Sequence, residues 1–218
     1  VLIHALASSR DPALAAFESG WPQASVHNLM DDALAQDLAA EGGITPAIEE
    51  RFLVLGRYAQ GTRGGDGRTL GILFTCSAFG PAIDRVRDDL QIPVLKPNEA
   101  AFEEAVALGG RIGLLVTFET ALAPLRAELL EIAARAGKVL AVSHAVAHGA
   151  LEALQMGDGD AHDRLVAQAA DTLRDVDVLV LCQFSLARAA PSIARVPGRT
   201  VLTTPDSAVA KLRRALAG

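Results

Sequence analysis

The sequence has few cysteines and few aromatic residues, and it has no long hydrophobic run. Only two cysteines occur in its 218 residues, and Phe, Trp and Tyr together make up 4% of them. The longest apolar runs, such as residues 176–182, have the length of a buried strand (about 4–8 residues) rather than the ~20 residues of a membrane span. The core must therefore consist mainly of Ala, Leu, Val and Ile, and no membrane partner is expected.

Charge and the first residues exclude further classes of protein. The formal net charge is −6, and the sequence contains no basic stripe and no cluster of basic and aromatic residues, which argues against nucleic acid as a partner. Residues 1–6 are apolar but have neither the basic n-region nor the cleavage site of a signal peptide. We therefore expect a cytoplasmic protein whose cysteines are free thiols.

Short β-rich runs alternate with longer helical runs along the whole chain. The strict alternation predicts an α/β fold with parallel sheets covered by helices on both sides. In such sheets, ligands bind outside the carboxyl ends of the strands. Strands are expected at residues 1–6, 24–29, 69–75, 91–96, 111–116, 138–143, 176–182 and 200–204. Helices are expected at residues 11–20, 45–60, 80–90, 99–109, 119–136, 145–156, 161–174, 185–194 and 206–217, and a glycine-rich turn at 61–67.

Both cysteines stand at the expected carboxyl ends of apolar strands. Cys76 follows residues 71–75, and Cys182 follows residues 177–181. One cysteine in such a place is more often a core residue, but two in matching places indicate a functional pair. Backbone N–H groups at the start of the next helix can lower the pKa of such a thiol. No Cys-x-x-Cys spacing occurs, so no metal site is expected.

Several short segments are similar to those of one known family. They are Thr75-Cys76-Ser77, residues 92–94 with 99–101, residues 111–117, the strand that ends at Cys182, and residues 205–208. Together they resemble the aspartate/glutamate/hydantoin racemase superfamily, and the order of elements agrees over nearly the whole chain. The residues that flank each cysteine depart from the commoner patterns of the family, which leaves the substrate open.

The resemblance implies two flavodoxin-like parallel-sheet halves related by a pseudo-twofold axis, with the active site in the cleft between them. The first half would comprise residues 1–100 and 196–218, and the second half residues 101–195. The implied activity is cofactor-independent racemisation at the α-carbon of an amino acid or derivative. One thiolate removes the α-proton and the opposite thiol delivers a proton to the other face, so that Cys76 and Cys182 would be the two acid–base residues.

The same resemblance implies a small carboxylate or hydantoin-like substrate, and it is compatible with a homo-oligomer. Removal of the α-proton gives an enediolate, which needs hydrogen-bond donors at its oxygens. Candidate substrate-binding residues are Ser8, Ser77, Thr117, Thr120 and Gln183. The first three can instead cap helices or form turns, and Gln183 can instead satisfy a loop, so both roles stay open.

The histidines are less informative than the cysteines. His144 and His148 lie four residues apart, a helical spacing that can present two metal ligands, but no third ligand is near in sequence. We therefore expect them to face solvent or pack locally. His27 is expected near the end of the second strand, from where it would reach the cleft.

Three other functions stay open for this scaffold. A maleate-type cis–trans isomerase would also keep two cysteines. An arylmalonate-type decarboxylase is similar in layout, but such family members keep only the second cysteine, so that the presence of Cys76 counts against this function. The third is a non-catalytic protein that binds a small ligand. Sulfurs that face each other would favour two-base transfer, whereas sulfurs turned into separate cores would argue against it.

Overall fold

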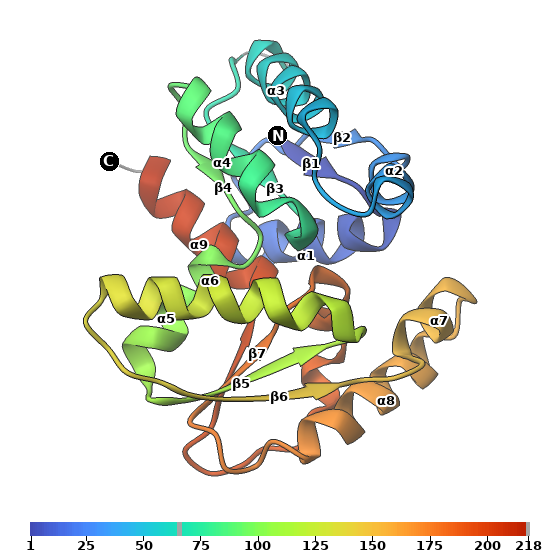
Figure 1. Cartoon of the computed structure of the whole chain (residues 1–218), viewed down its shortest axis with the longest axis vertical. Helices are drawn as coiled ribbons and strands as arrows, with labels where there is room; N and C mark the ends of the chain where they lie inside the picture. The colour runs from blue at the N-terminus through green and yellow to red at the C-terminus, as the bar shows by residue number, and fades with distance from the viewer. Residues whose placement is uncertain (65–66, 217–218) are drawn as a thin grey trace. The chain divides into compact units, whose positions relative to one another are not determined.

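The chain folds into two compact units, each built on a parallel sheet (Figure 1). The computed structural model describes residues 1–64 and 67–216. Residues 65 and 66 of the expected turn, and residue 217 of the last expected helix, lie outside the described residues. The first unit comprises Val1–Pro97 and Ala208–Gly218, and the second comprises Asn98–Ser207.

The sheet of the first unit has the strand order β2-β1-β3-β4, and every pair in it is parallel. The strands are β1 (Leu2–His4), β2 (Asn28–Met30), β3 (Ile72–Phe74) and β4 (Val94–Leu95). This is the order of a flavodoxin-like sheet, as expected from the sequence. The chain places β2 on one side of β1 and then places β3 and β4 on the other side, so the strand order has a switch point between β1 and β3. Ligands of such sheets bind beyond the carboxyl ends of the strands at this switch point.

An aromatic cluster fixes the segment around Cys76 in the first unit. The helices and 3₁₀-helices of this unit are η1 (Ala7–Ser9), α1 (Arg10–Gly20), α2 (Leu34–Glu41), α3 (Pro46–Gly61), η2 (Ser77–Phe79), α4 (Gly80–Asp89) and most of α9 (Thr204–Leu216). Phe52 of α3 contacts Phe74, the last residue of β3, with ring centroids 5.2 Å apart, and Phe79 of η2 at 4.8 Å. All three rings are buried, and each contributes about 1.5–3 kcal/mol of apolar burial. The backbone is thus anchored on both sides of Cys76.

The second unit repeats this strand order with longer strands. Its sheet has the order β6-β5-β7-β8, and all its pairs are parallel. The strands are β5 (Arg111–Val116), β6 (Ala141–Val146), β7 (Val178–Leu181) and β8 (Thr200–Thr203). Its helices are α5 (Glu99–Leu108), η3 (Glu119–Ala121), α6 (Leu122–Arg135), α7 (Ala150–Gln155), α8 (Gly159–Asp171) and the 3₁₀-helix η4 (Phe184–Ser192).

Alternate residues of β7 belong to two different hydrophobic cores. Val178 and Val180 pack with α5 and α6 on one face of the sheet, and Cys182 continues this set. Leu179 and Leu181 pack with α8 and η4 on the other face. Successive side chains of a strand point to opposite faces of the sheet. Whether a residue's position along the strand is odd or even therefore decides which of the two cores it enters.

The unit that holds the last strand and the type of one helix differ from the expectations. The last strand was assigned to the first half, but β8 pairs with β7 in the second sheet, with Val178 opposite Thr200. The chain returns to the first unit only at Ala208, within α9. The helix expected at residues 185–194 is the 3₁₀-helix η4, which contains Pro191. Proline donates no backbone hydrogen bond, so a regular α-helix is disfavoured there.

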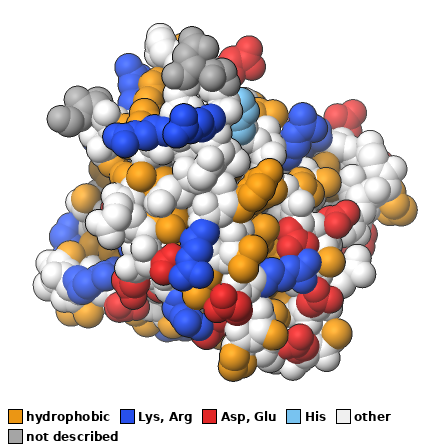
Figure 2. Space-filling view, turned by 90° about the horizontal axis from the view of Figure 1, so that it is seen from above, with side chains coloured by type: hydrophobic (Ala, Val, Ile, Leu, Met, Phe, Trp, Pro, Cys, Tyr) orange, Lys and Arg blue, Asp and Glu red, His pale blue; other side chains and the backbone are white. Residues whose placement is uncertain are grey.

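Surface charge is mixed. On the face drawn in Figure 2, Lys and Arg side chains are interspersed with Asp and Glu side chains and with hydrophobic ones. Among the described residues, no helix is both long enough and apolar enough to cross a membrane.

Candidate active site

Cys76 lies at the carboxyl edge of the first sheet. It follows Thr75, which comes directly after β3, and it is the N-cap of η2 with an extended backbone (φ −118°, ψ 119°). Its side chain is partly exposed and packs against the first core. β3 adjoins the switch point of the sheet, so the thiol stands where a flavodoxin-like sheet binds its ligand.

The surroundings of Cys76 favour the neutral thiol. Burial raises the pKa of Cys76, and a hydrogen bond from the backbone N–H of Ala78 opposes this effect without cancelling it. The expectation of a lowered pKa is therefore wrong for Cys76, because desolvation outweighs the helix N–H group. A thiol of this kind is mostly protonated at neutral pH, and it is suited to delivering a proton.

A buried network of polar side chains holds the strand ends beside Cys76. His4, the last residue of β1, is fully buried. Its Nδ1 lies 2.9 Å from Thr75 Oγ1 and 3.3 Å from Ser9 Oγ, and its Nε2 lies 2.9 Å from Asn28 Oδ1. The hydroxyl oxygens of Ser9 and Thr75 are 2.9 Å apart. The network joins β1, β2, η1 and the residue before Cys76, and the sequence analysis did not identify it.

The partners of His4 define its tautomer. Burial lowers the pKa of His4, and the hydrogen bond with Asn28 only partly opposes this. The ring is therefore neutral at pH 7. Because Asn28 Oδ1 is an acceptor, Nε2 carries the proton and donates it, and Nδ1 accepts a hydrogen bond from a hydroxyl group. This neutral network positions Thr75 without adding a charge near Cys76.

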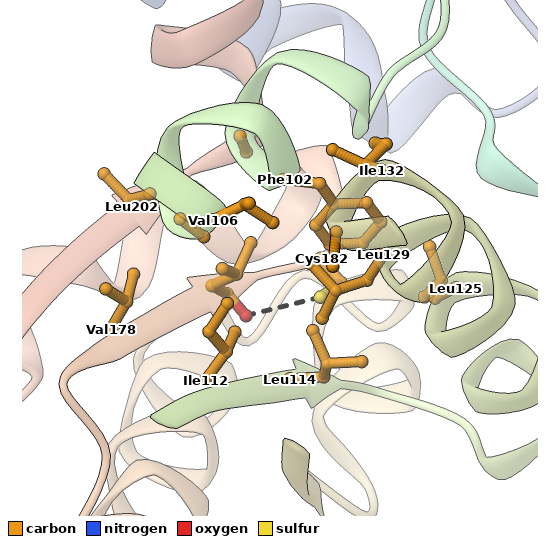
Figure 3. Packing of buried hydrophobic residues seen from close by; sticks show 14 of the residues in the cluster. Phe102, Val106, Ile112, Leu114, Leu125, Leu129, Ile132, Val178, Cys182 and Leu202 are labelled. Atoms are coloured by element: carbon orange, nitrogen blue, oxygen red, sulfur yellow. Dashed lines mark hydrogen bonds between the residues drawn. The ribbon is translucent and has the colours of Figure 1, made fainter. Parts of the chain in front are cut away.

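Cys182 lies in the hydrophobic core of the second unit. Its exposed fraction is 0%, and Figure 3 shows its sulfur among Phe102, Leu114 and Leu129. The thiol donates a hydrogen bond to the carbonyl oxygen of Val180, with Sγ and O 3.3 Å apart. Burial raises the pKa of Cys182 far above its usual range. The sequence pattern predicted instead a thiol at the strand end with a lowered pKa.

The two cysteines take different places in their sheets, offset by one residue. In the first sheet Phe74 pairs with Ile3, and the next N–H, that of Thr75, donates to Ile3 O at 3.0 Å. In the second sheet Leu181 pairs with Leu115, and the next N–H, that of Cys182, donates to Leu115 O at 3.0 Å. Cys182 is thus the counterpart of the buried Thr75.

Gln183 is the counterpart of Cys76. Each directly follows the residue whose backbone N–H donates the last hydrogen bond to the neighbouring strand, β1 for Thr75 and β5 for Cys182. Each is also the N-cap of a 3₁₀-helix. The backbone of Gln183 is extended (φ −134°, ψ 143°), like that of Cys76. Both side chains are partly exposed. The sequence matched Cys76 with Cys182, because the exact end of β7 is not visible in an apolar run.

Thr117 and Gln183, both candidate substrate-binding residues, are brought together. Gln183 Oε1 accepts a hydrogen bond from the backbone N–H of Thr117 at 2.8 Å and lies 3.0 Å from the Thr117 hydroxyl, which donates to it. Thr117 directly follows β5, so the pair lies at the carboxyl edge next to the switch point of the second sheet. The hydroxyl of Thr117 is used in this contact, and it does not cap η3, whose N-cap is Phe118.

The other three candidate substrate-binding residues also lie at the carboxyl edges of the sheets. Ser8 lies in η1, which follows β1, and is partly exposed. Ser77 is the first residue of η2, and the N-cap position is taken by Cys76. Thr120 is exposed in η3. Their binding roles stay predictions.

The histidines named from the sequence lie apart from Cys76. His144 and His148 are exposed, and within residues 1–64 and 67–216 no cluster of three or more His, Cys, Asp or Glu side chains is arranged to hold a metal ion. His27 precedes β2 and lies at the amino edge of the first sheet, so the expectation that it reaches the carboxyl edge is wrong. There it lines a cavity of about 590 Å³ that includes neither cysteine.

A charged cluster fixes the segment that follows Gln183. Arg188 of η4 bonds Asp163 of α8 through Nε at 2.9 Å and Nη2 at 3.2 Å. Asp163 also lies 2.8 Å from Nδ1 of the buried His162. Burial acts to raise the pKa of Asp163, but hydrogen bonds from Arg188 and His162 outweigh it and lower this pKa. The cluster ties η4 to α8, and no sequence pattern indicated it.

Comparison with known proteins identifies the family. Residues 24–212 match the family model described as Asp/Glu/Hydantoin racemase. The chain belongs to this family. The resemblance noticed in the sequence is thereby confirmed. No curated protein matches the chain.

Solved structures of racemases share the fold. A glutamate racemase isoform from Bacillus anthracis is 14% identical with a TM-score of 0.68, over 99% of this chain and 80% of that one. An allantoin racemase from Pseudomonas fluorescens is 16% identical with a TM-score of 0.64, over 98% and 88%. An aspartate racemase from Picrophilus torridus is 11% identical with a TM-score of 0.66, over 99% and 93%. These likenesses establish the α/β fold of two four-stranded parallel sheets.

Proposed function

We propose that this chain is an enzyme that moves a proton at the carbon next to a carboxylate or an equivalent carbonyl group, with Cys76 as the acid–base residue. The substrate is a small molecule such as an amino acid or a hydantoin-like compound, as in the relatives named above. The observation that carries the proposal is the position of Cys76 as a partly exposed N-cap at the carboxyl edge of β3.

The chemistry needs no group beyond the chain's own residues. The Cys76 thiol first gives its proton to water, because burial keeps it mostly protonated. The resulting thiolate then takes the α-proton, the S–H bond forms, and the electron pair of the C–H bond moves into the enediolate. Backbone N–H groups near the start of η2 are suited to stabilising the negative oxygen, because donors aimed at developing charge lower the barrier. Return of the same proton, or of one exchanged with solvent, restores the C–H bond.

Cys182 is not assigned a role in this reaction. Its sulfur donates to Val180 O within an apolar cluster, and formation of a thiolate there is strongly disfavoured by burial. The two-cysteine racemisation expected from the sequence would require this side chain to leave the core. The proposal therefore rests on one thiol.

Hydrogen–deuterium exchange at the α-carbon tests the proposal. The protein is incubated in D₂O with both enantiomers of aspartate, glutamate and a 5-substituted hydantoin, with samples lacking protein as the blank. We expect deuterium incorporation into at least one compound, and loss of this exchange in Cys76→Ala. Exchange that persists at full rate in Cys76→Ala would contradict the proposal.

A second candidate is decarboxylation of a malonate-type diacid, favoured by the burial of Cys182, which leaves Cys76 as the one thiol at a carboxyl edge. Loss of CO₂ generates the same enediolate, and a single thiol suffices to protonate it on one face. The thiol is then replenished from water. Release of CO₂ from phenylmalonate, lost in Cys76→Ala, would select this reaction, and its absence would leave α-proton exchange.

A further inference from the structure

A cavity of about 590 Å³ lies at the amino edge of the first sheet, opposite the edge that carries Cys76. Every described residue that lines it belongs to the first unit. Its volume falls in the range of about 300–1,000 Å³ that small-molecule sites have. We propose that this cavity binds a small organic anion with a flat apolar body, such as an aromatic carboxylate. The inference does not depend on the proposed function, because that reaction is assigned to the opposite edge.

Two stacked aromatic rings form one wall of the cavity. Phe17 of α1 is buried, and Trp21, the C-cap of this helix, is partly exposed. Their ring centroids are 6.2 Å apart, and the ring planes differ by 25°. Leu212 and Leu216 of α9 extend the apolar lining. A flat apolar ligand would remove the Trp21 ring from water and stack on it, and both effects favour binding.

The polar lining carries positive charge. Arg68 lines the cavity and is exposed, and among the described residues no hydrogen bond or ion pair occupies its guanidinium group. Ser25 and His27 also line the cavity, with Ser25 Oγ and His27 Nε2 3.3 Å apart. None of the described lining residues is Asp or Glu. A guanidinium group pairs with a carboxylate through two hydrogen bonds, so this lining selects an anion over a cation.

Hydrogen bonds of its neighbour hold Arg68 at the cavity. The backbone N–H of Thr69 donates to Thr62 O at 3.3 Å, and the two threonine hydroxyl oxygens are 2.9 Å apart. The Thr62 hydroxyl also lies 2.8 Å from Ala59 O, to which it donates, so these contacts tie the backbone beside Arg68 to the end of α3. Gly64 lies against the ring of His27, and a side chain at position 64 would displace this ring.

Trp21 is the only tryptophan of the chain, so its fluorescence reports on this cavity. The native protein is titrated with phenylacetate, phenylacetamide and phenethylamine, which share an aromatic ring and differ in charge. We expect a saturable change with phenylacetate and a Kd on the order of 0.1–1 mM, as for a ligand of about ten heavy atoms. The amide should bind about 10-fold more weakly, because it forms no charge-assisted hydrogen bond, and the amine should bind more weakly still.

Matched variants separate charge, shape and location. Arg68→Gln should weaken phenylacetate binding about 10-fold and leave amide binding unchanged. Arg63→Gln removes an exposed arginine that does not line the cavity, and it should bind phenylacetate like the wild type. Cys76→Ala should also bind like the wild type, which separates this cavity from the proposed site of chemistry. Ala24→Phe places a larger side chain in the lining and should abolish binding of both compounds.

Thermal unfolding shows whether each variant is folded, and Arg68→Gln, at an exposed residue, decides the matter if Ala24→Phe does not fold. Equal binding of the three compounds, or tighter binding of the amine, would overturn the inference. Phenylacetate binding that is unchanged in Arg68→Gln would also overturn it. A fluorescence change that follows protein concentration without any added compound would identify a second copy of the chain as the occupant, and would equally contradict the proposal.

Discussion

Cys76 and Gln183 occupy the same backbone position in two sheets with the same strand order. Each is the N-cap of a 3₁₀-helix. Each also directly follows the residue whose backbone N–H donates the last hydrogen bond to the neighbouring strand, β1 or β5. One position offers a thiol and the other offers an amide fixed by Thr117. A thiol can carry a proton, whereas an amide can only donate or accept hydrogen bonds.

Cys76 and Cys182 should differ strongly in their reaction with iodoacetamide. Cys76 is partly exposed, whereas Cys182 is 0% exposed. We expect one adduct on the native wild-type protein, located at Cys76, and a second only in denaturant. The rate at Cys76 should still be rising with pH at about pH 9, because burial raises the pKa of this thiol. Two adducts formed at similar native rates would contradict the burial of Cys182.

The protein should lose stability at alkaline pH through Cys182. A thiol in the unfolded chain ionises near pH 8.5, about the usual value, whereas burial raises the pKa of Cys182 in the folded chain. Above about pH 8.5 the unfolded chain releases a proton that the folded chain keeps. The free energy of unfolding therefore falls as pH rises, by up to about 1.4 kcal/mol per pH unit from this group.

Urea unfolding at pH 7.5, 8.5 and 9.5 measures this dependence. Cys182→Ala removes the thiol, keeps Cys76 and every other titrating group, and should show the smaller loss between the lowest and highest pH. Removal of the sulfur itself should lower stability at pH 7.5 by about 1–2 kcal/mol, as for small deletions in a core. Parallel losses in both proteins would show that Cys182 does not ionise on unfolding in this range.

Replacement of His4 by Asn should destabilise the protein at neutral pH and less so in acid. At pH 7.5 the variant loses contacts of a buried ring with Thr75 and Asn28, and we expect a loss of about 1–3 kcal/mol. In the wild type, burial lowers the pKa of His4 below its unfolded value of about 6.5. As pH falls below about 6.5 the unfolded chain takes up a proton that the folded chain does not, so the wild type loses stability.

The gap in unfolding free energy between wild type and His4→Asn should therefore narrow from pH 7.5 to pH 5.5. His148→Asn, at an exposed histidine, is the matched control and should track the wild type at both pH values. An unchanged gap would mean that His4 is protonated equally in both states.

Thr117→Val should weaken the positioning of Gln183 while leaving the shape of the side chain almost unchanged. The variant keeps the N–H bond to Gln183 Oε1 and loses the hydroxyl bond, which contributes about 0.5–1.5 kcal/mol. We expect the free energy of unfolding, measured by urea unfolding, to fall by about this amount. Thr200→Val, at an exposed threonine of β8, is the control for the same replacement. Equal losses of unfolding free energy in the two variants would argue against a role for this contact.

The layout of the fold could be read from the sequence because apolar runs and helical runs alternate so regularly. The strands expected at 69–75 and 176–182 correspond to β3 and β7. α2 was not foreseen, because a helix of eight residues leaves only a short pattern in the sequence. The assignment of β8 to the second sheet depends on pairing with β7, a long-range choice that the run itself does not encode.

Less of the candidate site than of the fold could be predicted from the sequence. Cys182 ends an apolar run, and the structure ends β7 one residue earlier, at Leu181. With a side-chain period of two, this single residue sends Cys182 into the core and moves Gln183 to the place that corresponds to Cys76. The network around His4 was missed for a related reason, since its members come from segments up to 71 residues apart.

The most direct test of the account is the rate of α-hydrogen exchange in D₂O for the wild type, Cys76→Ala and Cys182→Ala, with thermal unfolding confirming that each protein is folded. We expect Cys182→Ala to exchange within threefold of the wild-type rate, and Cys76→Ala to lose about 10²–10⁴-fold, the usual contribution of a general acid–base residue. Loss of exchange in Cys182→Ala as complete as in Cys76→Ala would contradict it.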